Sequence, residues 1–155
     1  MLGSNHTFEG LPFNIMANVT YLVYLGVGNN MGSACYYTCF VKIGNETQLL
    51  PNTSLGTASP LPALYEYDLF VGDGGTWEAP LTFKVNNLGF ANGVCQLSEI
   101  TIDGLNYPVN IASAWDSNQT GFYYNLFVEL SMYNSKSGIM QYNNRYVDLI
   151  LNMTQ

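Results

Sequence analysis

The chain has 155 residues, a length typical of one domain, and a net charge of −7 from 11 acidic and 4 basic side chains. The four cations lie far apart in the sequence, so they form no concentrated basic patch for nucleic acid or an anionic membrane. No run of about 18 apolar residues occurs, and the start lacks the basic and apolar regions of a signal peptide. We therefore expect any export or anchoring segment to lie outside this sequence.

Apolar and polar side chains alternate along most of the chain, which is the period of a β-strand. In residues 122–133 one face is wholly apolar and the other is mixed, and in residues 65–71 Glu66, Asp68 and Phe70 point away from the apolar side. The stretch from Pro51 to Pro62 is the one long loop. The expected strands cover residues 13–17, 21–27, 34–43, 65–71, 77–85, 94–102, 105–109, 122–133 and 146–153.

Turn residues separate these strands. Asp103-Gly104 predicts a two-residue hairpin turn that needs positive φ, and Pro108 marks the returning strand as an edge strand or as its end. Eight or nine short strands without a helical pattern favour an all-β fold, an immunoglobulin-like sandwich of antiparallel strands. No internal repeat or linker divides it, so we expect a single extracellular domain over residues 1–155.

Acceptor motifs for Asn-linked sugar place the chain outside the cell. Six Asn-x-Ser/Thr motifs occur, none of them with proline in the middle. Several lie in segments that are expected to be turns, where a bulky sugar disturbs no packing. The alternative is an unmodified, asparagine-rich surface. The candidate glycosylation sites are Asn5, Asn18, Asn45, Asn52, Asn118 and Asn152.

The three cysteines allow at most one disulfide bond within the chain. Cys35 and Cys39 lie on one expected strand about 13 Å apart, at about 3.3 Å per residue, which is too far for a direct bridge. A disulfide must therefore join Cys95 to Cys35 or to Cys39. The alternative is that all three are buried, free thiols that act as small apolar side chains.

Catalytic and metal-binding patterns are sparse. His6 is the one imidazole available for a nucleophile–base pair, and the sequence has no clustered cysteine or histidine ligands for zinc. Asp116 begins a segment like half of a calcium loop, but Phe127 stands where the bidentate glutamate is needed. We expect no enzyme activity, cofactor or metal. A carboxylate pair of a glycosidase could be drawn only from acids that more simply keep the strands soluble, namely Glu66, Asp68, Asp73 and Glu78.

Three tyrosines are expected on strand faces opposite the apolar ones. They are Tyr36, Tyr123 and Tyr133. Flat rings on an open face can stack on a sugar or anchor a protein contact. Ordinary pairing between neighbouring strands beneath glycans is the alternative explanation.

Several segments resemble the archaeal membrane-protein ectodomain family called domain of unknown function 1616. The resemblance rests on residues 2–6 with 12–15, 24–33, 36–38, 64–67, 75–80 and 143–147, while residues 86–111 do not align. It implies an archaeal surface protein, anchored by helices preceding this domain, with no assigned activity and no functional residue to transfer.

Together these features predict a non-catalytic, glycosylated cell-surface module with a structural or adhesive role. The alternative is a carbohydrate-binding module that uses exposed tyrosines. Expected partners are other cell-surface proteins or glycans, not nucleic acid, and contact with a membrane would be made only through a segment absent from this chain. A free edge strand would also permit self-association.

Overall fold

The computed structural model describes residues 1–154, and within that range it contains nine strands and no helix. The prediction of an all-β chain is therefore confirmed. In chain order the strands are β1 (Asn14–Met16), β2 (Thr20–Gly28), β3 (Cys35–Asn45), β4 (Tyr65–Val71), β5 (Thr76–Ala91), β6 (Val94–Ile102), β7 (Leu105–Ala114), β8 (Tyr123–Asn134) and β9 (Ile139–Thr154).

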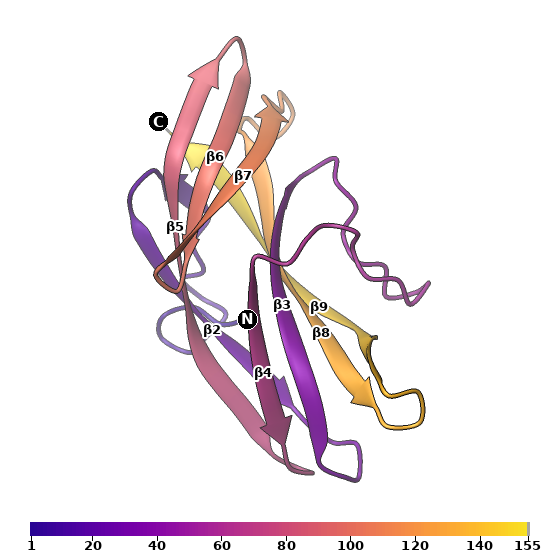
Figure 1. Cartoon of the computed structure of the whole chain (residues 1–155). Coiled ribbons are helices and arrows are strands. Elements are labelled where there is room, and N and C mark those ends of the chain that lie inside the picture. The colour runs from indigo at the N-terminus through magenta and orange to yellow at the C-terminus, as the bar shows by residue number, and fades with distance from the viewer. Residues whose placement is uncertain (155) are drawn as a thin grey trace.

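The strands form two sheets that face each other (Figure 1). The five-stranded sheet has the order β1-β9-β8-β3-β4, and the four-stranded sheet has the order β2-β5-β6-β7. All neighbouring strands are antiparallel except β1 and β9, which pair in parallel over three residues each. This pair brings Asn14 beside Asn152, so segments far apart in the sequence complete one edge of the five-stranded sheet.

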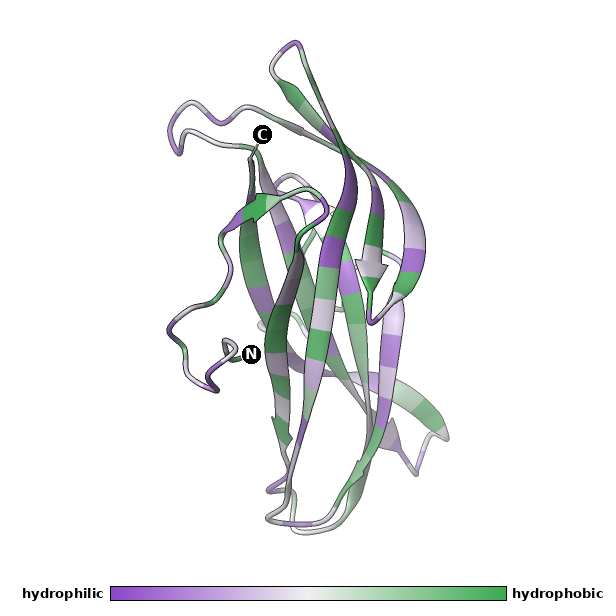
Figure 2. Cartoon of the chain, turned by 90° about the vertical axis from the view of Figure 1, so that its left-hand side faces the viewer, coloured by the Kyte–Doolittle hydropathy of each residue, from purple (hydrophilic) through white to green (hydrophobic). Residues whose placement is uncertain are grey.

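The core lies between the sheets and follows from the two-residue period of the strands. Figure 2 shows apolar and polar bands alternating along individual strands. The inward side chains of β2, Val23, Leu25 and Val27, are buried, and β8 contributes Leu126 and Val128 from the other sheet. Burial of each such side chain stabilises the fold by about 1.5–3 kcal/mol relative to exposure.

The turns follow the expected chemistry. Asp103 and Gly104 join β6 to β7 with φ values of 46° and 80°, as a two-residue hairpin turn requires. Pro108 lies in β7, which is an edge strand of the four-stranded sheet and continues to Ala114. The prediction of an edge strand is therefore confirmed, although the proline does not end it.

Three strands are much longer than the sequence predicts, namely β7, which continues to Ala114, and β5 and β9. β5 continues through the Asn86–Gly89 segment to Ala91, because a β-bulge between Val85 and Leu88 absorbs these residues without ending the strand. β9 begins at Ile139 rather than at residue 146, because a short turn after β8 starts a long hairpin. A register shift near Leu130 divides that hairpin into two parts.

Candidate functional site

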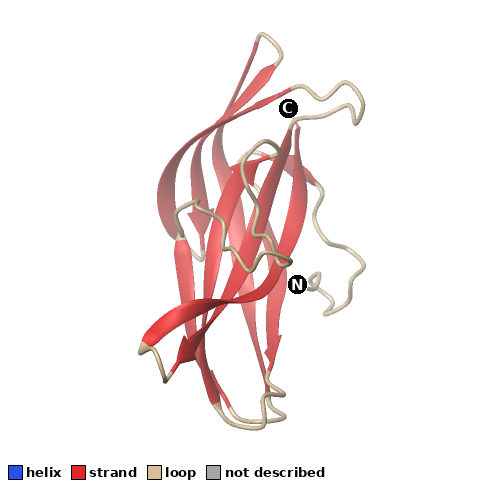
Figure 3. Cartoon of the chain, turned by 90° about the vertical axis from the view of Figure 1, so that its right-hand side faces the viewer, coloured by secondary structure: helices blue, strands red, loops and turns tan. Residues whose placement is uncertain are grey.

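The outer face of the five-stranded sheet is divided into a covered part and a bare part. The loop between β3 and β4, residues 46–64, lies over this face (Figure 3). Lys42 on β3 and Glu129 on β8 point outward beneath the loop, yet both are buried. Phe127 shares this outward face and is fully buried as well. The loop thus adds a second buried layer outside the sheet.

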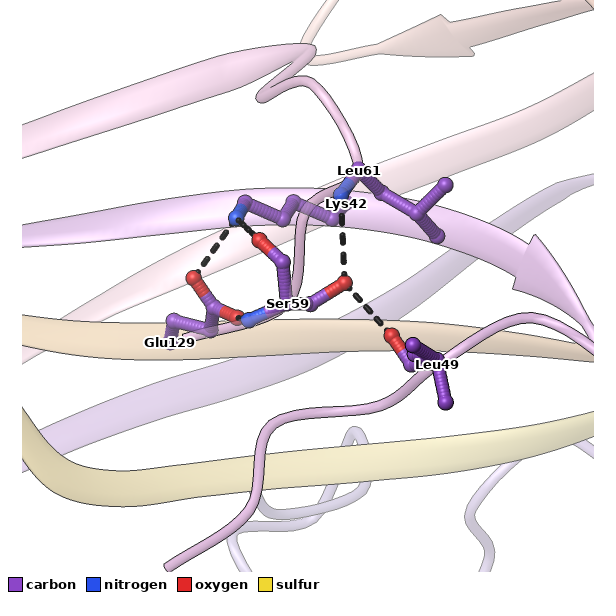
Figure 4. A network of polar contacts seen from close by, with 5 residues as sticks. All are labelled: Lys42, Leu49, Ser59, Leu61 and Glu129. Carbon is purple, nitrogen blue, oxygen red and sulfur yellow. Dashed lines mark hydrogen bonds and ion pairs between the residues drawn. The ribbon is translucent and has the colours of Figure 1, made fainter. Parts of the chain in front are cut away.

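A buried ion pair holds the loop in place (Figure 4). Lys42 Nζ lies 2.7 Å from Glu129 Oε2 and donates a hydrogen bond of 2.9 Å to the Ser59 carbonyl oxygen. The Ser59 amide in turn donates to Glu129 Oε1 at 2.5 Å. The Ser59 hydroxyl donates to the Leu49 carbonyl and accepts from the Leu61 amide. Both charges are therefore paired and hydrogen-bonded, as buried charges must be.

The geometry of the ion pair suits a structural role. Lys42 and Glu129 are almost fully enclosed, and their polar atoms are bound to each other and to the loop. Beside them the hydroxyl of Tyr142 is buried without a hydrogen-bond partner in the described residues. Burial, followed by the nearby charge of Glu129, raises the pKa of Tyr142. The cluster therefore fixes residues 46–64 and leaves one polar group unsatisfied.

The bare part of the same face carries a row of aromatic side chains. Phe70 on β4 lies directly opposite Tyr36 on β3, and continuing the β3–β8 register by one residue places Tyr36 opposite Tyr133. The exposed fractions are 71% for Phe70, 40% for Tyr36 and 46% for Tyr133. Because neighbouring strands lie about 4.8 Å apart, these three residues form a strip about 10 Å long, here called the aromatic strip.

Polar groups border the aromatic strip. In the adjacent row of the sheet, the Thr38 hydroxyl donates to Asp68 Oδ1 at 2.7 Å. Desolvation, followed by hydrogen bonding to Asp68 and by its charge, raises the pKa of Tyr36. The phenol of Tyr36 therefore remains protonated at neutral pH. Rings beside a carboxylate and hydroxyls offer both stacking surface and hydrogen-bonding groups to a ligand.

Two of the three tyrosines that were expected on exposed faces, Tyr36 and Tyr133, lie in the aromatic strip, and the third does not. Tyr123 is buried rather than exposed, because the segment before β8 folds over it and its hydroxyl donates to the Gln119 carbonyl at 2.6 Å. Its ring also lies 6.2 Å from that of Phe13. Sequence reasoning did not select Phe70 for the site, although it placed Phe70 on the outward face. The missing information was the register between β3 and β4.

The six acceptor asparagines fall into two groups. Asn45 Nδ2 donates to the Ala112 carbonyl at 2.7 Å and links β3 to β7, while Asn152 Nδ2 donates to Asn14 Oδ1 at 3.1 Å beside β1. A sugar on either nitrogen would have to fit beside a neighbouring strand. The other four side chains are exposed, and within residues 1–154 no hydrogen bond engages their amide nitrogens: Asn5, Asn18, Asn52 and Asn118.

The three cysteines are free thiols in this structure, which contains neither of the two possible disulfides to Cys95. Tyr124 lies opposite Asn45 on β3, and its hydroxyl donates to the Cys95 carbonyl, which places Cys95 level with Asn45. Cys39 is six residues from Asn45 along the strand, about 20 Å at 3.3 Å per residue, and Cys35 is farther away. Burial raises the pKa of Cys39 to about 12.

Of the four acidic side chains that sequence reasoning considered for catalysis, Asp68, Asp73 and Glu78 have local partners, whereas Glu66 has none within residues 1–154. Asp73 accepts from the Gly32 amide at 2.8 Å, and Glu78 lies 2.8 Å from His6 Nδ1. Asp116 accepts from the amides of Asn118 and Gln119, so it shapes the turn before β8. Within residues 1–154 no three acidic, histidine or cysteine side chains come together as metal ligands.

Comparisons with protein-family models, with curated proteins and with solved structures find no match to this chain. The resemblance to the archaeal ectodomain family therefore stays a prediction. Among the described residues, no helix has the length and apolar character needed to cross a bilayer.

Proposed function

We propose that this chain is a non-catalytic, glycosylated cell-surface module with a structural or adhesive role. The observation that carries the proposal is the presentation of four acceptor asparagines with exposed side chains: Asn5, Asn18, Asn52 and Asn118. Because these side chains are exposed, sugars attached to them can extend into solvent. The two-sheet arrangement supports an immunoglobulin-like sandwich, a fold shared by many cell-surface domains.

The location and the family belong to the same proposal. The short segments that resemble the archaeal ectodomain family are the basis for proposing an archaeal surface protein held by an anchor outside this chain. Few charged residues and a net charge of −7 are consistent with an exported surface that meets proteins or glycans rather than nucleic acid.

Glycopeptide mass spectrometry of protein from a host with Asn-linked glycosylation tests the proposal. We expect sugar on the four exposed acceptors and bare peptide at Asn45 and Asn152, whose amide nitrogens are bound between strands. An Asn118→Gln variant should lose one glycan, whereas Asn152→Gln should leave the number of attached glycans unchanged. Bare peptide at all six acceptors would contradict the proposal.

The aromatic strip supports a second candidate, a carbohydrate-binding module. Phe70, Tyr36 and Tyr133 lie in one row on a sheet face, beside Asp68 and Thr38, which offer hydrogen bonds. Such a row can stack on the apolar face of a sugar ring while polar groups bind its hydroxyls. The strip is also compatible with a protein contact, because aromatic side chains are enriched at the centres of interfaces.

A glycan array distinguishes the two ligand classes. We expect saturable binding to at least one glycan, reduced at least about tenfold by Tyr36→Ala, since stacked rings supply most of the contact. Phe8→Ala is the matched control, because Phe8 is an exposed ring outside the strip. Absence of any ligand on the array, or equal losses in both variants, would eliminate the carbohydrate-binding candidate and leave the strip as a protein contact.

A further inference from the structure

One side of the sandwich is closed by side chains and the other is open. On the closed side Tyr67 of β4 packs against Trp77 of β5, with ring centroids 5.7 Å apart, and its hydroxyl donates to the Asp103 carboxylate. On the open side, the edge strand β2 faces β9 across a cleft of about 490 Å³. Its walls include Leu25, Gly26, Val27, Gly28, Val128 and Arg145.

The N-terminal segment already fills the part of the open side next to this cleft. Leu2 and Tyr24 exchange two backbone hydrogen bonds of 2.8 Å, an antiparallel bridge on the free edge of β2. Met1 and Leu11 also pack against the core. The edge of β2 is therefore able to accept an added strand, and the chain itself does so at one position.

The free edge continues beyond that bridge. In an antiparallel strand the N–H and C=O of one residue point to the same side, and the side alternates with each residue. The backbone N–H and C=O of Tyr24 point to the free edge, because they bond to Leu2. The backbone groups of Gly26 and Gly28 therefore point to the free edge as well. β2 is the last strand of its sheet, so no strand of residues 1–154 lies beside these two glycines on that side.

Neither crowding nor backbone conformation within the chain requires glycine at positions 26 and 28. A Cβ atom added at Gly26 would approach nothing nearer than the Trp77 carbonyl oxygen at 3.9 Å, and one at Gly28 nothing nearer than Thr76 Oγ1 at 3.9 Å. Neither residue has a positive φ. Glycine within a strand is less favourable than alanine by about 0.5–1 kcal/mol, and close approach of a ligand or another backbone is one of the reasons for its use there, beside bulges and tight bends.

The charge of the cleft indicates the chemistry of its occupant. Arg145 is one of 4 cations in a chain of net charge −7, and it makes no ion pair within residues 1–154. No acidic side chain lines the cleft. Its apolar wall and its single cation therefore fit a segment with apolar side chains and a carboxylate.

We propose that the cleft between β2 and β9 accepts an extended segment of another polypeptide as an added β-strand. The segment pairs with the backbone of Gly26 and Gly28, places alternate apolar side chains on Leu25, Val27 and Val128, and brings an acidic residue to Arg145. This is recognition by strand addition, in which backbone hydrogen bonds supply affinity and alternate side chains supply specificity. It uses no acceptor asparagine and no residue of the aromatic strip. Thr53, which follows the acceptor Asn52, lines the same cleft, so binding is measured on protein without sugar to keep the two proposals distinguishable.

Fluorescence anisotropy with two synthetic peptides tests the proposal. The first is a labelled nonapeptide in which valine alternates with aspartate and threonine, and the second has lysine in place of aspartate. We expect the wild-type protein to bind the acidic peptide in preference to the basic one. Gly26→Pro removes a donor on the free edge, adds a ring there and fixes φ at about −65°, so it should weaken binding at least about tenfold. Circular dichroism checks its folding, and Gly28→Pro replaces it if it does not fold.

Reversing the charge at Arg145 provides a second test of the proposal. Arg145→Glu should weaken binding of the acidic peptide and strengthen binding of the basic one, whereas Lys136→Glu, with the same charge change in the turn after β8, should alter neither by more than about twofold. Equal affinity of wild-type protein and folded proline variants for the acidic peptide would overturn the proposal. No saturable binding would overturn it as well. Self-association of the wild type that Gly26→Pro abolishes would replace the partner segment by a second copy of this chain.

Discussion

The outer face of the five-stranded sheet carries two regions built from the same strands, β3 and β8. Beneath the loop, Lys42 and Glu129 are buried and pair with each other, whereas farther along the same strands Tyr36 and Tyr133 lie open to solvent. The difference reverses the usual preference, because charged side chains are enclosed and large rings are exposed. On this face, the presence of a covering loop with hydrogen-bonding partners determines which side chains are buried. The polarity of the strand residues matters less.

The largest effect is expected from breaking the buried ion pair. Glu129→Ala leaves the Lys42 ammonium enclosed without its counterion and removes the acceptor of the Ser59 amide. We expect a loss of about 3–5 kcal/mol in the free energy of unfolding, measured by urea denaturation. The double variant Lys42→Met with Glu129→Leu removes both charges and should recover most of that loss. A double variant as unstable as the single one would show that the charges themselves stabilise the loop.

A smaller effect is expected at the loop. Ser59→Ala removes the hydroxyl that donates to the Leu49 carbonyl and accepts from the Leu61 amide, but keeps the backbone contacts with the ion pair. Two lost hydrogen bonds should lower the free energy of unfolding by about 1–2 kcal/mol. Amide hydrogen exchange should rise within residues 46–64 and stay unchanged at the aromatic strip. Faster exchange throughout the sheet would contradict the view that the loop is a separate layer.

The unsatisfied hydroxyl beneath the loop gives a prediction of opposite sign. Tyr142→Phe removes a buried polar group without a partner, so it should raise the free energy of unfolding by about 0.5–1 kcal/mol at neutral pH. The pKa of Tyr142 is raised in the folded state, so the wild type loses stability as the pH rises above about 10, where the unfolded tyrosine deprotonates. The variant should lose less over that range in parallel urea titrations. A destabilised variant would show that the hydroxyl has a partner.

The smallest effect on stability is expected in the bare region. Tyr36→Ala removes an exposed ring that lies opposite Phe70 in the strand register, and should change the free energy of unfolding by about 0.5 kcal/mol. A loss comparable with that of Glu129→Ala would show that the strip supports the fold instead of a ligand.

The regular parts of the fold could be predicted because they depend on neighbouring residues. The alternation through β8 and the Asp103-Gly104 turn act locally, and each is confirmed. The burial of Tyr123 and the enclosure of Glu129 could not be predicted in this way. Glu129 is enclosed by a loop that returns from a distant part of the chain, and Tyr123 is covered by the turn directly before β8 and by Phe13. A two-residue period describes the faces of a strand but not what covers them.

The same limit applies to the candidate sites. Sequence reasoning found Tyr36 and Tyr133 but could not join them to Phe70, because registers between strands far apart in the sequence depend on the whole sheet. The open side between β2 and β9 had no signal beyond the glycines at positions 26 and 28, which are also common in turns.

The parallel pairing of β1 with β9 determines how the domain responds to mechanical load. Asn14 to Met16 run alongside Asn152 to Thr154 in the same direction, and the Asn152 amide donates to the Phe13 carbonyl at 2.7 Å. Tension applied at residues 14 and 154 pulls the two strands past each other along their axes. The hydrogen bonds between them then bear the force together instead of breaking one at a time, so this short pair acts as a clamp that resists extension.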